Sequence, residues 1–102
     1  MALAHITEFR RLGEDKRGRT LPFPHADSSW VNQVKTFTTS SVQSDAFNNG
    51  TNLIRVMVTA DANFEIGSSP TAVKDVSPKM NADTAEYFAV NPGDKIAFIQ
   101  ST

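Results

Sequence analysis

From residue 30 onward, hydrophobic and polar residues alternate with a period of two, which is typical of β-strands with one buried face. The segment "LIRVMVTA" at 53–60 shows this pattern most clearly. The segments "WVNQVKTFTTSSVQ" at 30–43 and "KIAFIQ" at 95–100 are dense in β-branched and aromatic residues, which favour strands. This part of the chain is therefore predicted to consist of short β-strands.

Turn signals separate these predicted strands. "NNGTN" at 48–52 and "NPGD" at 91–94 contain the Asn, Pro and Gly residues that favour chain reversals, and a loop rich in Ser and Pro follows Gly67. "NPGD" predicts a hairpin between "AEYFAV" and "KIAFIQ". No alternation of strands with helices is visible, so residues 30–102 predict an all-β domain, an antiparallel sandwich or barrel. We interpret it as a jelly-roll-like β-sandwich.

Residues 1–29 show no sustained period, because Gly13, Gly18, Pro22 and Pro24 interrupt any regular element. Within it, residues 6–12 fit a short helix, but Thr7 and Phe9 fit an extended strand as well. We interpret residues 1–29 as an extended N-terminal arm whose apolar and basic side chains bind a partner. The expected partner-binding residues are Ile6, Phe9, Arg10, Arg11, Leu12, Arg17, Arg19, Phe23 and Trp30.

Charge is distributed unevenly along a chain whose formal net charge is −1. Five of the ten basic residues lie within "RRLGEDKRGR" at 10–19, but two acidic residues interrupt this cluster, so a nucleic-acid partner is not expected. The chain has no cysteine, which excludes disulfides and thiolate metal sites. It also has neither an apolar run of membrane-spanning length nor a signal-peptide pattern, so we expect no membrane association and synthesis without secretion.

The alternating polar residues Asp61, Asn63 and Glu65 are the first candidate site, because three oxygen-bearing side chains on one strand face can begin a calcium site. The same pattern arises when Phe64 and Ile66 face the core and the polar row is solvated. The row lacks the glycine and the distant glutamate of an EF-hand loop. We therefore interpret it as the solvated face of a strand.

Catalytic patterns are weak along the whole sequence. His5 and His25 have no second ligand at metal-binding spacing, and no G-x-S-x-G or S-x-x-K motif accompanies the many Ser and Thr residues. Asp75, Asp83 and Glu86 lie in or beside a polar loop, where solvated carboxylates are the usual case. We expect no enzyme activity, no metal and no cofactor.

Two longer strings carry a family resemblance. "RVMVTADANFEIGSSPTA" at 55–72 and "TAEYFAVNPGDKIAFIQ" at 84–100 resemble small virion proteins of tailed bacteriophages, over roughly residues 53–100. The resemblance implies a head decoration (cement) protein, a β-sandwich that sits on the capsid surface after synthesis in the host cytoplasm. It implies the major capsid protein as partner, a trimer or dimer on the particle, and no catalytic or ligand-binding residues.

Two other functions remain open at this point. The chain is also compatible with a neck, tail or fibre component of the virion, which copy number in the particle distinguishes from a decoration protein. A carbohydrate-binding β-sandwich module is the second alternative. It requires exposed aromatic side chains, and the sequence has only one Trp and one Tyr.

Overall fold

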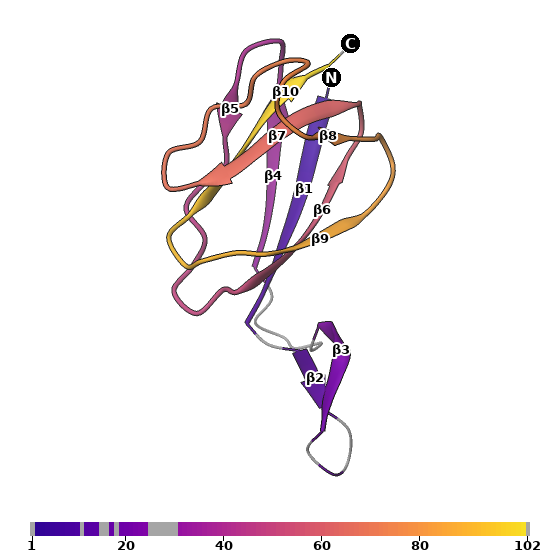
Figure 1. Cartoon of the computed structure of the whole chain (residues 1–102), viewed down its shortest axis with the longest axis vertical. Helices are drawn as coiled ribbons and strands as arrows, with labels where there is room; N and C mark the ends of the chain where they lie inside the picture. Colours follow the sequence, from indigo (N-terminus) through magenta and orange to yellow (C-terminus); the bar gives the residue numbers. More distant parts are fainter. Residues whose placement is uncertain (1, 11, 15–16, 18, 25–30, 102) are drawn as a thin grey trace.

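The computed structural model describes residues 2–10, 12–14, 17, 19–24 and 31–101. These residues form strands and connections without a helix, arranged as two four-stranded antiparallel sheets and a separate two-stranded hairpin (Figure 1). The strands are β1 (Ala2–Phe9), β2 (Leu12–Glu14), β3 (Thr20–Pro24), β4 (Val31–Phe37), β5 (Val42–Gln43), β6 (Leu53–Val58), β7 (Ala62–Gly67), β8 (Lys79–Met80), β9 (Glu86–Ala89) and β10 (Lys95–Gln100).

The two large sheets are the two layers of a β-sandwich. One has the strand order β4-β1-β6-β9 and the other β5-β10-β7-β8. Every neighbouring pair is antiparallel, as the alternating sequence predicts. The all-β, antiparallel expectation for residues 30–102 is therefore confirmed at this level.

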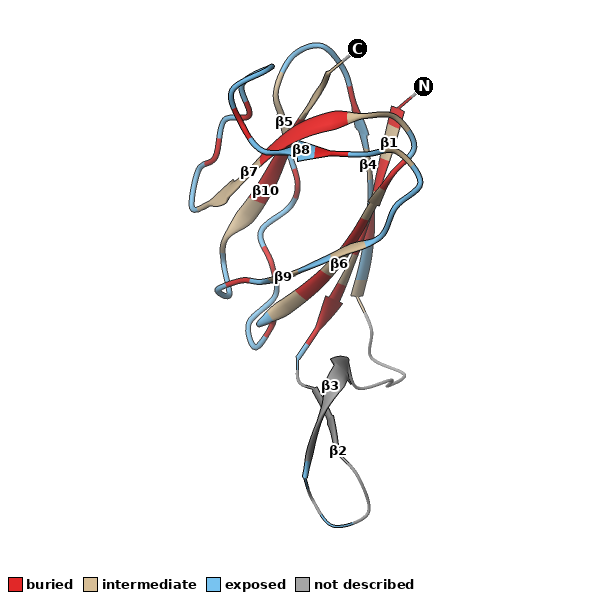
Figure 2. Ribbon diagram, turned by 45° about the vertical axis from the view of Figure 1, so that its right-hand side comes forward, coloured by how far each residue is buried: buried red, intermediate tan, exposed pale blue. Residues whose placement is uncertain are grey.

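The core lies between the inner faces of the two sheets (Figure 2). In β6 every second residue is fully buried, so Ile54, Val56 and Val58 all face inward. The rings of Phe37 and Phe98 bring the two sheets into contact, with centroids 5.6 Å apart. Each large apolar side chain buried in this way contributes roughly 1.5–3 kcal/mol to folding.

The first eight described residues are not an arm, and the expected boundary at residue 29 is wrong for them. β1 lies in the middle of its sheet, hydrogen-bonded to β4 on one side and β6 on the other. Ala2, Ala4 and Ile6 point into the core and are at most 7% exposed. The physical reason is that these inward side chains alternate with half-buried ones along the segment, which is the pattern of a strand with one face on the core.

What remains of the expected arm contains a hairpin. β2 and β3 pair antiparallel, with Leu12 opposite Pro24 and Glu14 opposite Thr20. The hairpin is inserted between β1 and β4, and Figure 1 shows it beyond the end of the sandwich. The two flanking strands pair directly, with Glu8 opposite Val31, so the sandwich closes without the hairpin.

The turn at 91–94 forms, but it does not make the expected hairpin. Gly93 has a φ of 86°, and the Asp94 N–H donates to the Asn91 carbonyl oxygen at 3.2 Å. β9 pairs with β6, whereas β10 pairs with β5 and β7 in the other sheet. The residues of this turn therefore determine that the chain reverses direction, but not which strands pair. The pairing follows burial, because Phe88 of β9 packs on Phe64 of β7 with ring centroids 5.1 Å apart.

Candidate functional site

Two of the nine expected partner-binding residues serve the fold instead. The side chain of Ile6 is fully buried in the core, and that of Phe9 is 5% exposed. A side chain without accessible surface contacts a partner only if the sandwich opens, so both assignments are corrected. The cause is the β1 strand, which the arm interpretation missed.

The other expected residues belong to the hairpin and its flanks. Arg10, directly after β1, is exposed, as are Arg17 and Arg19 in the connection between β2 and β3. Leu12 lies in β2 and Phe23 in β3. The remaining two expected residues, Arg11 and Trp30, lie outside the described residues. The described part thus presents exposed cations at both the base and the tip of the hairpin.

The polar row on β7 is less solvated than expected, because Asn63 is only 4% exposed. Its Nδ2 donates to the Ser77 carbonyl oxygen at 2.7 Å, and its Oδ1 accepts from the Asp75 N–H at 3.3 Å. The expectation of a solvated face is therefore wrong for this residue. A buried amide needs such partners, and here they hold a loop against the sheet.

Asp61, which precedes β7, also contacts nearby protein groups through its side chain. Its Oδ1 accepts from the Ala82 N–H at 2.8 Å, and its Oδ2 lies 3.8 Å from the Nζ of Lys79. Glu65 is half-buried. Among the described residues, no group of three or more His, Asp or Glu side chains is arranged to hold a metal ion. Asp61 and Asn63 of this row therefore bind neighbouring loop segments.

Residues 68–78 lie over the outer face of the β5-β10-β7-β8 sheet. Gln43 donates from Nε2 to the Pro70 carbonyl oxygen at 2.8 Å, and the Ala72 N–H donates to Ser41 Oγ at 2.9 Å. Ala97 of β10 is fully buried although its two neighbours along the strand face the core. Residues 68–78 therefore cover part of the outer face of the β5-β10-β7-β8 sheet.

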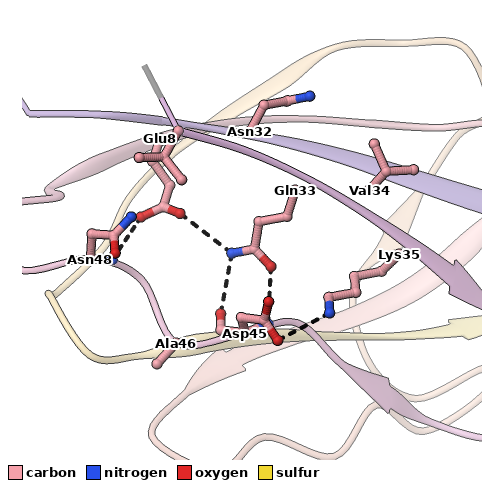
Figure 3. A pocket seen from close by; sticks show the side chains of 9 residues that line it. Glu8, Asn32, Gln33, Val34, Lys35, Asp45, Ala46 and Asn48 are labelled. Carbon is pink, nitrogen blue, oxygen red and sulfur yellow. Dashed lines mark hydrogen bonds and ion pairs between the residues drawn. The ribbon is translucent and has the colours of Figure 1, made fainter. Parts of the chain in front are cut away.

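An open depression of about 290 Å³ lies beside β4, at the side of the sandwich. Figure 3 shows polar side chains from β1 and β4 pointing across it toward the segment 45–48. Its lining consists of Glu8, Val31, Asn32, Gln33, Val34, Lys35, Asp45, Ala46 and Asn48.

Glu8 closes the inner end of this depression and is 4% exposed. Its Oε1 accepts hydrogen bonds from the Asn48 N–H and from Thr51 Oγ1, both at 2.8 Å. Its Oε2 accepts a longer bond, 3.4 Å, from Gln33 Nε2. A buried carboxylate is costly unless hydrogen bonds compensate it, and these three do so. The geometry suits a carboxylate that holds the fold.

Gln33 and Lys35 attach the segment 45–48 to β4. The Gln33 amide accepts from the Asp45 N–H at 3.0 Å and donates to the Asp45 carbonyl oxygen at 3.3 Å, as a neighbouring strand would. Lys35 Nζ lies 3.0 Å from Asp45 Oδ1, with side chains 30% and 77% exposed. Sequence reasoning missed this network, because its members come from distant segments with no characteristic spacing.

The described part of the chain contains no helix that could cross a membrane. Comparisons with known proteins give no family assignment, because no family model, no curated protein and no solved structure matches this chain.

Proposed function

We propose that this chain is a non-enzymatic structural protein of a tailed-phage virion, a head decoration protein that binds the major capsid protein and links neighbouring capsid subunits. A jelly-roll-like connection of the two sheets is part of this proposal. The resemblance over residues 53–100 supports the virion assignment. The observation that carries the attachment is the pair of exposed arginines, Arg17 and Arg19, in the connection between β2 and β3.

The hairpin is available for a partner because the sandwich does not need it. Glu8 and Val31 pair directly across β1 and β4, so the chain leaves and re-enters the sheet at adjacent positions. A hairpin inserted at such a point adds no strand to either large sheet. Surface insertions on a rigid scaffold are common carriers of binding function.

The charge of the hairpin favours an acidic partner. Residues 10–24 contain five basic and two acidic residues, whereas residues 31–102 contain five basic and seven acidic ones. The exposed Arg17 and Arg19 lie at the tip, where they meet a partner first. Complementary charges of this kind raise association rates and weaken with added salt. We therefore expect attachment to acidic capsid surface and release at high ionic strength.

The test is an internal excision, since truncation from the N-terminus removes the central strand β1. Residues 10–29 are replaced by Asn-Gly, which favours the tight turn that joins antiparallel strands. The shortened chain is expected to keep its β circular dichroism spectrum and to lose binding to purified particles. Retained binding by a folded, shortened chain contradicts attachment through the hairpin.

A charge reversal sharpens this test without changing chain length. The double variant Arg17→Glu, Arg19→Glu is expected to bind particles at least about tenfold more weakly at low salt. Lys74→Glu is the matched control, because Lys74 is an exposed cation on the sandwich. Equal weakening by both variants indicates a general charge effect and contradicts a specific role of the hairpin.

A further inference from the structure

The four edge strands of the two large sheets differ strongly in length. β4 has seven residues, β9 has four, and β5 and β8 have two each. β4 ends its sheet, so within the described residues one of its two hydrogen-bonding edges carries no strand. Short edges resist pairing with other chains, whereas a long edge is a template for an added strand.

The side chains of β4 fit an added strand on both faces. On the outer face, Val34 at the middle of the strand is 49% exposed and is flanked by the exposed polar residues Asn32 and Thr36. On the inner face, Gln33 and Lys35 reach the segment 45–48 and border the open depression. Figure 3 shows Asn32 and Val34 pointing away from that segment.

We propose that two copies of this chain pair antiparallel through β4, about a two-fold axis at Val34. The strand spans residues 31–37, so this register, with Val34 opposite itself, pairs every residue of both strands. Each Asn32 then lies opposite a Thr36, which places polar beside polar and apolar beside apolar on the outer face. The β4-β1-β6-β9 sheet of one copy and the same sheet of the second copy then form one continuous sheet of eight strands.

Charge complementarity identifies a second copy as the occupant. In this register Lys35 lies opposite Gln33 of the second copy, and the Gln33 amide holds the main chain of Asp45. The Lys35 ammonium, which lies 3.0 Å from Asp45 Oδ1 of its own chain, is thus also brought toward the Asp45 side chain of the second copy, which is 77% exposed. The inward-pointing lysine faces the mouth of a depression that also contains Glu8. No two like charges meet along the paired strands.

The dimer has a consequence for the hairpins. Each hairpin precedes β4 in the chain and leaves the sandwich at the end where β4 begins (Figure 1). Antiparallel pairing reverses one β4 relative to the other, so the two hairpins project from opposite ends of the dimer. This inference goes beyond the proposed function and is tested in solution without any particle.

The first experiment measures the mass of the full chain by sedimentation over a concentration series. The wild type is expected to dimerise reversibly. Val34→Lys places two lysines opposite each other on the axis and is expected to weaken dimerisation at least about tenfold. Val76→Lys is the matched control, since Val76 is 79% exposed on the loop over the other sheet. It is expected to leave the dimer unchanged.

A mixing experiment keeps the proposal falsifiable if Val34→Lys disturbs folding. Lys35→Glu and Asp45→Lys are each expected to weaken the homodimer. When the two variants are mixed, the introduced glutamate of one copy faces the introduced lysine of the other, and the unchanged Lys35 faces the unchanged Asp45. Native mass spectrometry is therefore expected to show a heterodimer that is at least about tenfold stronger than either homodimer.

Three results overturn the proposal. The first is a wild type that stays monomeric at every soluble concentration. The second is a dimer that Val34→Lys leaves intact, which assigns the contact to another surface. The third is a mixture without a preferred heterodimer. If the wild type is monomeric and Val34→Lys abolishes binding to particles, the occupant of the β4 edge is an extended strand of the capsid and not a second copy.

Discussion

The outer faces of the two sheets are covered to different extents by the rest of the chain. Residues 68–78 cover the β5-β10-β7-β8 sheet, so that Ala97 and Asn63 are at most 4% exposed on its outer side. The outer face of the β4-β1-β6-β9 sheet is open by comparison. On it, Leu3, His5, Thr7, Leu53, Arg55 and Met57 are half-buried, and Val34 and Tyr87 are exposed.

This difference separates a closed layer from an open layer of the same sandwich. The closed layer uses side-chain hydrogen bonds from Gln43, Ser41 and Asn63 to hold its own loop. The open layer has the long edge strand β4, which lines the depression around Glu8, and the hairpin is inserted between two of its strands, β1 and β4. We infer that the open layer is the one that meets other chains. Substitutions at four sites, three of them with a matched comparison variant, test the difference between the layers.

The largest effect is expected at β1, whose two faces belong to the core and to the open surface. Ile6→Asp places a charge at a fully buried position and is expected to lower the free energy of unfolding by more than about 4 kcal/mol. Thr7→Asp, one residue along on the open face, is expected to cost less than about 1 kcal/mol. Urea unfolding measures both. Similar losses contradict the central position of β1.

The next effect concerns the buried carboxylate beside β4. Glu8→Ala leaves the Asn48 N–H without its acceptor and is expected to cost about 1–3 kcal/mol. Glu8→Gln keeps one carbonyl oxygen and is expected to cost less than the alanine variant. The measurement is thermal unfolding of the three chains side by side. A neutral Glu8→Ala argues against a structural role for this carboxylate.

A smaller effect is expected in the closed layer. Asn63→Ala removes the bonds to Ser77 and Asp75 and is expected to cost about 1–2 kcal/mol. Amide exchange is expected to rise mainly within residues 68–78, because the loop loses its attachment. Glu65→Ala, two residues along on the same face, is the control and is expected to change exchange little. Unchanged exchange in the loop shows that Asn63 does not hold it.

The smallest effect is expected at the tip of that loop. Val76→Ser exchanges an apolar for a polar side chain at a position that is 79% exposed, and is expected to change stability by less than about 0.5 kcal/mol. Particle binding is expected to stay unchanged. A clear loss of binding places a partner contact on the closed layer and contradicts the division between the layers.

The sequence predicts β6, β7 and β10 well, because their inward positions hold mainly large β-branched or aromatic side chains. It predicts β4 from residues of the same types on both faces, although Gln33 and Lys35 point inward. β1 is different, since its inward residues are two alanines, Ile6 and Glu8, while Leu3 and Phe9 lie on the outward side of the alternation. The size pattern therefore points to the wrong face. The glycines and prolines that follow belong to the hairpin region. Because the arm interpretation extends their effect to the whole of residues 1–29, it misses the strand before them.

The candidate site was less accessible to sequence reasoning than the strands. Glu8, Gln33 and Asp45 meet only because β1 and β4 pair and the segment after β5 returns beside them. No local period encodes such a meeting. The basic cluster around Arg17 and Arg19, in contrast, was visible as composition, and both side chains are exposed in the fold.

The virion assignment is tested most sharply by the copy number of this protein in purified particles, counted by quantitative mass spectrometry against the major capsid protein. A decoration protein follows the capsid lattice, so we expect between about one-third and one copy per capsid subunit. A ratio near one in a few dozen assigns the protein to the neck or tail. Its absence from the particle contradicts the proposed virion function.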